Sequence, residues 1–422
     1  MSSKKILLTN GIVVTMNDAR EIFHDACVEI QDGLIHRVAP SQCFDLAAPD
    51  TECVDLRGHL ILPGLIDCAG FAGKTMCRGL LTERNGGAMA VPGTVPDILK
   101  NGTFWADDAV SFAVERTRRG VTTGVVIFPD DAALSTEYTN AYIDAYRKTG
   151  AGLFAVCALS SKANAADALY IAPSDLTDAA EQVSNAARSA AQLRKKLFVG
   201  TRGGLVDLLE SRLPEIRAAE LVFLHCNGMT YREARIIANE GWSVVHTPAH
   251  TSRYAPFAEL WSLGVRPAIS PHNMVFYANT DMLQAVRRAQ MIEQLRMDDL
   301  NYLPVGTQLE AITIHAAQVL GMGDAVGSVE PGKRADLITV DLNRPHLVPW
   351  KTMPLHRFMM DGNANDIDNV MIGGRFIMRN RCIEMSNARR ATLYEDGETI
   401  GLCDRPDFGK AYRVHGGENA NG

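Results

Sequence analysis

The stretch that decides the fold is HLILPGLIDCAGF, residues 59–71, which leads on to TMCRGL at residues 75–80. Two short apolar runs stand on either side of the Pro63-Gly64 pair. Short apolar runs bounded by proline and glycine are typical of buried strands. The pattern of the chain changes at residue 61, so we place a domain boundary there.

Residues 4–60 read as short strands separated by turns, among them strands at 5–8 and 12–15. Asp32-Gly33 lies between two such strands, and because both residues tolerate positive φ it predicts a hairpin. After residue 61, apolar runs alternate with helical stretches, a pattern that indicates a parallel sheet. We expect six to eight such units up to residue 326, which suits an α/β fold of the (β/α)8 TIM-barrel type with its active site at the C-terminal strand ends.

After a helix expected at 308–320, the run GSVEPGKRADLITVD at residues 327–341 marks the return of the chain from the barrel to the β unit. Gly373-Gly374 predicts the turn of a last hairpin. We therefore expect a small discontinuous β-sandwich domain from residues 1–60 plus 327–422. The barrel domain is expected at residues 61–326.

Composition narrows the class of protein. The chain has 422 residues, 46% of them hydrophobic, and a formal net charge of -7 without a basic cluster. We therefore expect no nucleic-acid partner and no membrane partner. The N-terminus lacks a signal-like apolar region, and nine cysteines occur without a C-x-x-C pair. These features favour a cytoplasmic protein in a reducing compartment.

Residues 59–80 resemble the first barrel strand of the amidohydrolase superfamily, in particular its aminohydrolase and chlorohydrolase branch. There, a Pro-Gly-Leu-Ile-Asp run leads into a His-x-His pair. The run at 327–341 is also close to a signature of this family. The resemblance implies a hydrolytic metal held by these two histidines, a strand-five histidine and a strand-eight aspartate, with a glutamate that moves protons.

This chain departs from that set of residues. Counted forward from Pro63 or backward from Arg78, the two histidine positions fall on Ala69 and Phe71. The fifth strand, expected at residues 196–203, contains neither histidine nor glutamate, and the aspartate position of strand eight falls on His272. We therefore expect no cofactor, and no metal at the usual position.

A cluster of histidines remains near the expected strand ends. His225 matches the strand-six histidine that, by the resemblance, contacts the substrate. The candidates for catalysis are His225, His246, His250, His272 and Cys68. The candidates for substrate binding are Asp67, Phe71, Arg78, Arg202, Asn273 and Tyr254. Each has a structural alternative: His246 can be a core histidine, and an inert buried thiol is favoured for Cys68.

Three functions remain open. The first is an amidohydrolase-like hydrolase that cleaves a C–N or related bond of a small, heterocyclic substrate through a divergent, metal-free histidine site. The second is a catalytically inactive subunit of an oligomer. The third is a metal-free lyase or isomerase on the same scaffold. The expected partners are a small-molecule substrate and other copies of the chain in a homo-oligomer, or an active homologue in a hetero-oligomer.

Overall fold

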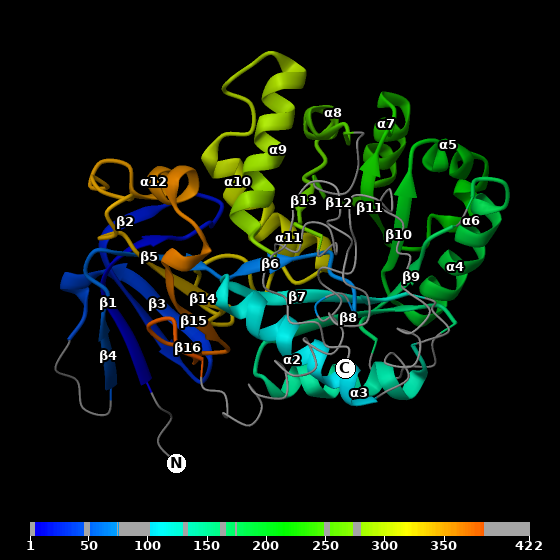
Figure 1. Cartoon of the computed structure of the whole chain (residues 1–422). Coiled ribbons are helices and arrows are strands. Elements are labelled where there is room, and N and C mark those ends of the chain that lie inside the picture. Colours follow the sequence, from blue (N-terminus) through cyan, green and yellow to red (C-terminus); the bar gives the residue numbers. More distant parts are fainter. Residues whose placement is uncertain are drawn as a thin grey trace, which may run out of the picture.

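Two eight-stranded sheets organise the chain (Figure 1). The computed structural model describes, apart from the side chain of Arg202, residues 5–45, 51–73, 75, 102–129, 134–160, 166–173, 175–248, 254–272 and 280–383. One sheet is a parallel barrel formed by the middle of the chain, and the other is built from segments near both ends. This arrangement confirms the predicted fold class.

The barrel strands follow one another in chain order, and every neighbouring pair is parallel. The strands are β6 (Leu65–Asp67), β7 (Val121–Phe128), β8 (Gly152–Ala158), β9 (Ala168–Ile171), β10 (Leu197–Arg202), β11 (Leu221–Asn227), β12 (Ser243–His246) and β13 (Ala268–Ile269). The strand sought at residues 196–203 is therefore the fifth of the barrel. The strands form a nearly closed barrel. In the described residues, β6 and β13 are the two ends of this order.

Helices lie on the outside of the barrel strands (Figure 1). Those in the barrel part are α2 (Gly102–Arg118), α3 (Thr136–Lys148), α4 (Ala179–Leu193), α5 (Leu205–Leu209), α6 (Leu213–Ile216), α7 (Tyr231–Glu240), α8 (Phe257–Ser262), α9 (Met282–Met297), α10 (Val305–Ala311) and α11 (Ile314–Leu320). Local sequence explains their bounds: α7 begins with a capping box between Thr230 and Glu233 and ends at left-handed Gly241. The single helix predicted at 308–320 is two helices, α10 and α11.

The second sheet has the order β16-β15-β14-β5-β1-β2-β3, with β4 paired to β1. Its strands are β1 (Lys5–Val14), β2 (Ile22–Gln31), β3 (Leu34–Pro40), β4 (Thr51–Asp55), β5 (His59–Pro63), β14 (Leu337–Asp341), β15 (Ile367–Ile372) and β16 (Arg375–Met378). The two strands predicted at 5–8 and 12–15 are one strand with irregular register, β1. Both predicted hairpins form.

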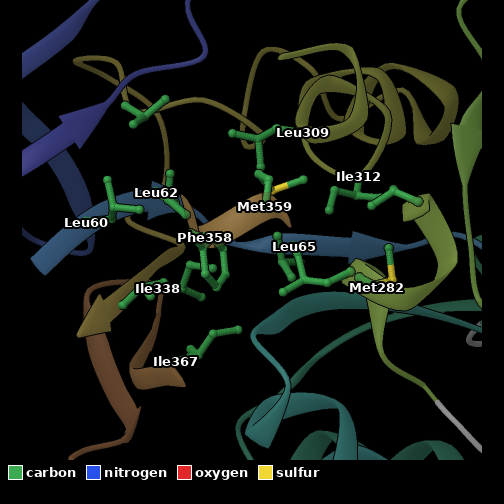
Figure 2. Packing of buried hydrophobic residues seen from close by; sticks show 14 of the residues in the cluster. Leu60, Leu62, Leu65, Met282, Leu309, Ile312, Ile338, Phe358, Met359 and Ile367 are labelled. Atoms are coloured by element: carbon green, nitrogen blue, oxygen red, sulfur yellow. The ribbon is translucent and has the colours of Figure 1, made fainter. Parts of the chain in front are cut away.

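A shared apolar core joins this sheet to the barrel (Figure 2). Leu60 and Leu62 of β5 belong to it, as does Leu65 of β6, so the deciding stretch crosses from one sheet to the other through this core. Phe358, on helix α12 (Pro354–Asp361), is fully buried in the same cluster. The predicted domain borders at residues 60 and 326 stay a prediction. In the described residues, every helix is too short or too polar to cross a membrane.

Candidate active site at the barrel mouth

Three histidines stand at neighbouring C-terminal strand ends. His225 lies on β11 and pairs in register with His246 of β12, and His272 follows β13. Their exposed fractions are only 7%, 2% and 4%. His225 and His272 have positive φ angles of 73° and 52°, which is uncommon outside glycine. Unusual backbone of this kind concentrates at functional sites.

Two of these histidines are in contact. The rings of His225 and His272 lie 4.8 Å apart between centroids, at an interplanar angle of 77°. Nδ1 of His225 forms a 2.8 Å hydrogen bond with Oγ1 of Thr247, the residue that follows β12. This bond fixes the orientation of the His225 ring.

Aromatic rings extend this contact across the barrel mouth. The Phe71 ring lies 5.1 Å from the His272 ring and 5.9 Å from the Tyr170 ring, both edge to face. Phe71 follows β6 and Tyr170 lies on β9. The structure therefore brings together three residues that the sequence singled out, Phe71, His225 and His272, and adds Tyr170 and Thr247.

His246 lies in a different environment. Its ring is 5.8 Å from Phe257, which belongs to the core shared with the second sheet. Burial lowers the pKa of His246 to about 4. The imidazole is therefore neutral near pH 7, as expected of a histidine in the barrel wall.

Cys68 is fully buried beside Asp67, and its thiol donates to the Ala316 carbonyl oxygen at 3.7 Å. Burial, followed by the nearby charge of Asp67, raises the thiol pKa well above its ordinary value. Because the thiolate is the reactive form, this environment is unfavourable for a nucleophile.

Asp67, a candidate for substrate binding, forms a buried ion pair with Arg116. Its Oδ2 accepts from Nη2 of Arg116 on α2 at 2.6 Å, and both side chains are fully buried. Its Oδ1 accepts from the Ser270 hydroxyl and, at 3.2 Å, from the Ala69 N–H. Asp67 therefore has partners on α2, directly after its own strand and directly after β13.

The remaining candidates are Tyr254, His250, Arg78, Asn273 and Arg202. The Tyr254 side chain is 58% exposed, although its carbonyl oxygen accepts from the Gly228 N–H after β11. His250, Arg78 and Asn273 lie outside the described residues, as does the side chain of Arg202.

That the family's metal ligands are replaced at the barrel mouth stays a prediction. Ala69 and Phe71 have no side-chain donor atoms, and the Thr201 hydroxyl on β10 donates to the Val199 carbonyl oxygen. In the described part of the chain, three potential ligands converge only on the second sheet, at His59, Asp341 and Asp368. Arg344 forms ion pairs with both of those carboxylates, at 3.2 and 3.0 Å.

The family model for the amidohydrolase family matches residues 190–377. This match, to less than half of the chain, agrees with the resemblance to the amidohydrolase superfamily. A 5-methylthioadenosine/S-adenosylhomocysteine deaminase from Syntrophobacter fumaroxidans is 25% identical over 90% of this chain and 94% of its own length. A 5'-deoxyadenosine deaminase from Methanothermobacter thermautotrophicus is 30% identical over 39% of each chain.

Solved structures share the fold of this chain along nearly its whole length. An adenosine deaminase from Xanthomonas campestris with bound zinc has a TM-score of 0.78 at 22% identity, covering 94% of this chain and 98% of its own. The atrazine chlorohydrolase of Arthrobacter aurescens, complexed with zinc, has a TM-score of 0.78 at 18% identity, covering 94% and 99%.

Proposed function

We propose that this protein cleaves a C–N bond in a small, adenosine-like or related heterocyclic substrate at the barrel mouth. The observation that carries the proposal is the contact between His225 and His272 at the ends of two barrel strands. Active sites of barrels lie at this end. The deaminase names of relatives that align along nearly the whole chain support the type of bond and substrate.

The aromatic residues suit a heterocyclic substrate. Phe71 and Tyr170 offer ring edges and faces beside the two histidines, and aromatic rings contact one another favourably at such distances. A planar purine or triazine ring placed against them brings its amino-bearing carbon close to His225 and His272. Substrate recognition then depends on ring contacts more than on charge.

The histidine pair supplies the proton transfers that hydrolysis needs. Thr247 bonds Nδ1 of His225, so we assign Nε2 as the general base that removes a proton from water as its oxygen adds to the carbon. His272 then donates a proton to the amino group, which leaves as ammonia while the C–N bond breaks. Acid and base catalysis of this kind contributes about 10²- to 10⁴-fold each.

The proposed site works without the family's metal. Water keeps a high pKa when no metal binds it, so the base must remove the proton as the oxygen attacks. We therefore expect slower turnover than a site with a metal-bound hydroxide gives. This expectation follows from the residues at the mouth, where Ala69 and Phe71 stand at the strand-one ligand positions.

Ammonia release tests the proposed function. The purified full-length protein is incubated with 5'-methylthioadenosine, S-adenosylhomocysteine, 5'-deoxyadenosine and atrazine, and products are identified by mass spectrometry. Conversion of an amino group to an oxygen, with one equivalent of ammonia, supports the proposal. A product of unchanged mass would indicate an isomerase. If no substrate is converted once any co-purifying homologue has been removed, the result would favour the inactive subunit.

A further inference from the structure

The first and last barrel strands meet through side chains. In the described residues no backbone ladder joins β6 to β13. Ser270, directly after β13, makes the connection: its hydroxyl donates to Asp67 at the end of β6 and accepts from the Ala69 N–H at 3.1 Å. One buried serine thus joins the two strand ends at the barrel mouth.

Arg116 supplies the charge that this connection needs. Its Nη2 donates both to Asp67 and, at 2.8 Å, to the Val125 carbonyl oxygen of β7. The guanidinium carbon lies 3.9 Å from the centroid of the Phe112 ring. The charge of Asp67 is therefore balanced from α2, which a buried carboxylate requires.

The backbone around Arg116 is shaped to hold it. A Cβ on Gly70 would lie 2.0 Å from Nη2, and a Cβ on Gly124 would lie 2.5 Å from Nη1. Only glycine at both positions leaves room for the guanidinium between β6 and β7. Arg116 therefore occupies a cavity that its neighbours form for it.

We propose that Asp67, Arg116 and Ser270 hold the end of β6 and residues 270–272 after β13 together. In the family, by the resemblance, the metal and its ligands would make this connection. Ser270 precedes His272 by two residues, and Asp67 precedes Phe71 by four. The two rings so positioned meet at 5.1 Å. Arg116 and Ser270 are then positioning residues for His272. The catalytic consequence rests on the proposed function, whereas the positioning itself can be tested without turnover.

The variants separate the hydroxyl from the charge. Ser270→Ala removes the connection but leaves Asp67 paired with Arg116. Its matched control is Ser184→Ala, a buried serine on α4. Arg116→Met leaves Asp67 buried without its counter-charge, which we expect to lower the Tm by roughly 5–10 °C. The double variant Asp67→Asn/Arg116→Met removes both charges and should regain most of that loss.

The measurement is the NMR spectrum of histidine-labelled protein, in which the His272 signals are assigned by their loss in His272→Gln. We expect Ser270→Ala to shift the His272 signals because the Phe71 ring moves relative to them, and Ser184→Ala to leave them in place. Treatment with EDTA, or addition of one equivalent of zinc chloride, should leave both these signals and the Tm unchanged.

Two results would overturn the inference. Unchanged His272 signals in Ser270→Ala would show that the serine does not position His272. A shift of the His272 signals by zinc or EDTA in the wild-type protein would show that a metal makes the connection. Neither result depends on catalysis, so the proposed function and this inference can fail separately.

Discussion

His225 and His272 lie with ring centroids 4.8 Å apart, although one lies near the end of the sixth barrel strand and the other follows the eighth. The seventh strand lies between them in the sheet and leads into Thr247, which bonds His225. A hydrophobic core gains little from two polar rings in this position. Their contact at the barrel mouth is therefore the basis for the proposed chemistry.

Replacement of either histidine should abolish most of the turnover. We expect His225→Asn and His272→Gln each to lower kcat/KM roughly 100-fold or more, because each removes a proton-transfer group. Steady-state assays of ammonia release measure the effect, with the Tm as a check on folding. His36→Gln, at an exposed histidine of β3, is the matched control and should keep wild-type activity. Turnover within a factor of two of wild type in both site variants would remove the histidine pair from the mechanism.

Thr247 should act through His225. Thr247→Val keeps the shape of the side chain but removes the 2.8 Å partner of Nδ1. We expect kcat to fall about 10-fold, the cost of an unmade buried hydrogen bond, with a shifted pH profile. Thr247→Ser retains the hydroxyl and should restore most of the activity. Equal losses in the valine and serine variants would point to packing instead of the hydrogen bond.

Cys68 should be unreactive in the folded protein. Its thiol is buried and its pKa is raised well above the ordinary value by burial and by Asp67. With iodoacetamide at pH 8, we expect alkylation of the exposed Cys43, Cys53 and Cys382, and of Cys68 only after denaturation. Peptide mass spectrometry measures each site. Rapid native labelling of Cys68, together with loss of turnover, would support a thiol nucleophile.

His246 should make the fold sensitive to acid. Burial lowers its pKa from 6.5 to about 4. Between these pH values the unfolded chain binds a proton that the folded chain excludes, so stability is present above pH 6.5 and is lost as the pH falls toward 4. The full effect is about 3 kcal/mol.

The Tm measured from pH 7 to pH 4 checks this expectation. His246→Leu should flatten the fall in Tm without removing it, because burial also lowers the pKa of His315 to about 4. His36→Gln, at the exposed position, should follow the wild-type curve. An identical slope in His246→Leu would mean that the folded and unfolded chains bind a proton at His246 equally, so that burial does not lower its pKa.

Much of the fold could be predicted because its signals are local. The strand β7 follows Gly120 directly, is rich in β-branched residues, and has all eight of its residues buried. The four-residue strand β9 was not predicted, because Ala168–Ile171 is too short to show a periodic pattern. The break between α10 and α11 was also missed, although the Thr313 hydroxyl there bonds the Leu309 carbonyl oxygen and Thr313 leaves helical backbone geometry.

In the candidate site, the contact of the histidines could be expected from the sequence, whereas their partners are ordinary residues that carry no signal. Thr247 and Ser270 stand beside quoted histidines, but hydroxyl groups at strand ends are too common to be a signal. The sequence does carry a signal for Arg116, because this residue falls four positions after Phe112 on the buried face of α2. Tyr170 could not be found without β9. The predicted oligomer and the cytoplasmic location stay predictions.

The most direct test of the metal-free histidine site combines metal analysis with ammonia release on the same sample. Protein is dialysed against a chelator, its zinc, iron and manganese content is measured, and turnover of the adenosine-like substrates is followed with and without added metal. We predict turnover that is independent of metal, in protein that contains far less than one metal ion per chain. Turnover that disappears on chelation and returns with about one equivalent of zinc would contradict the central claim.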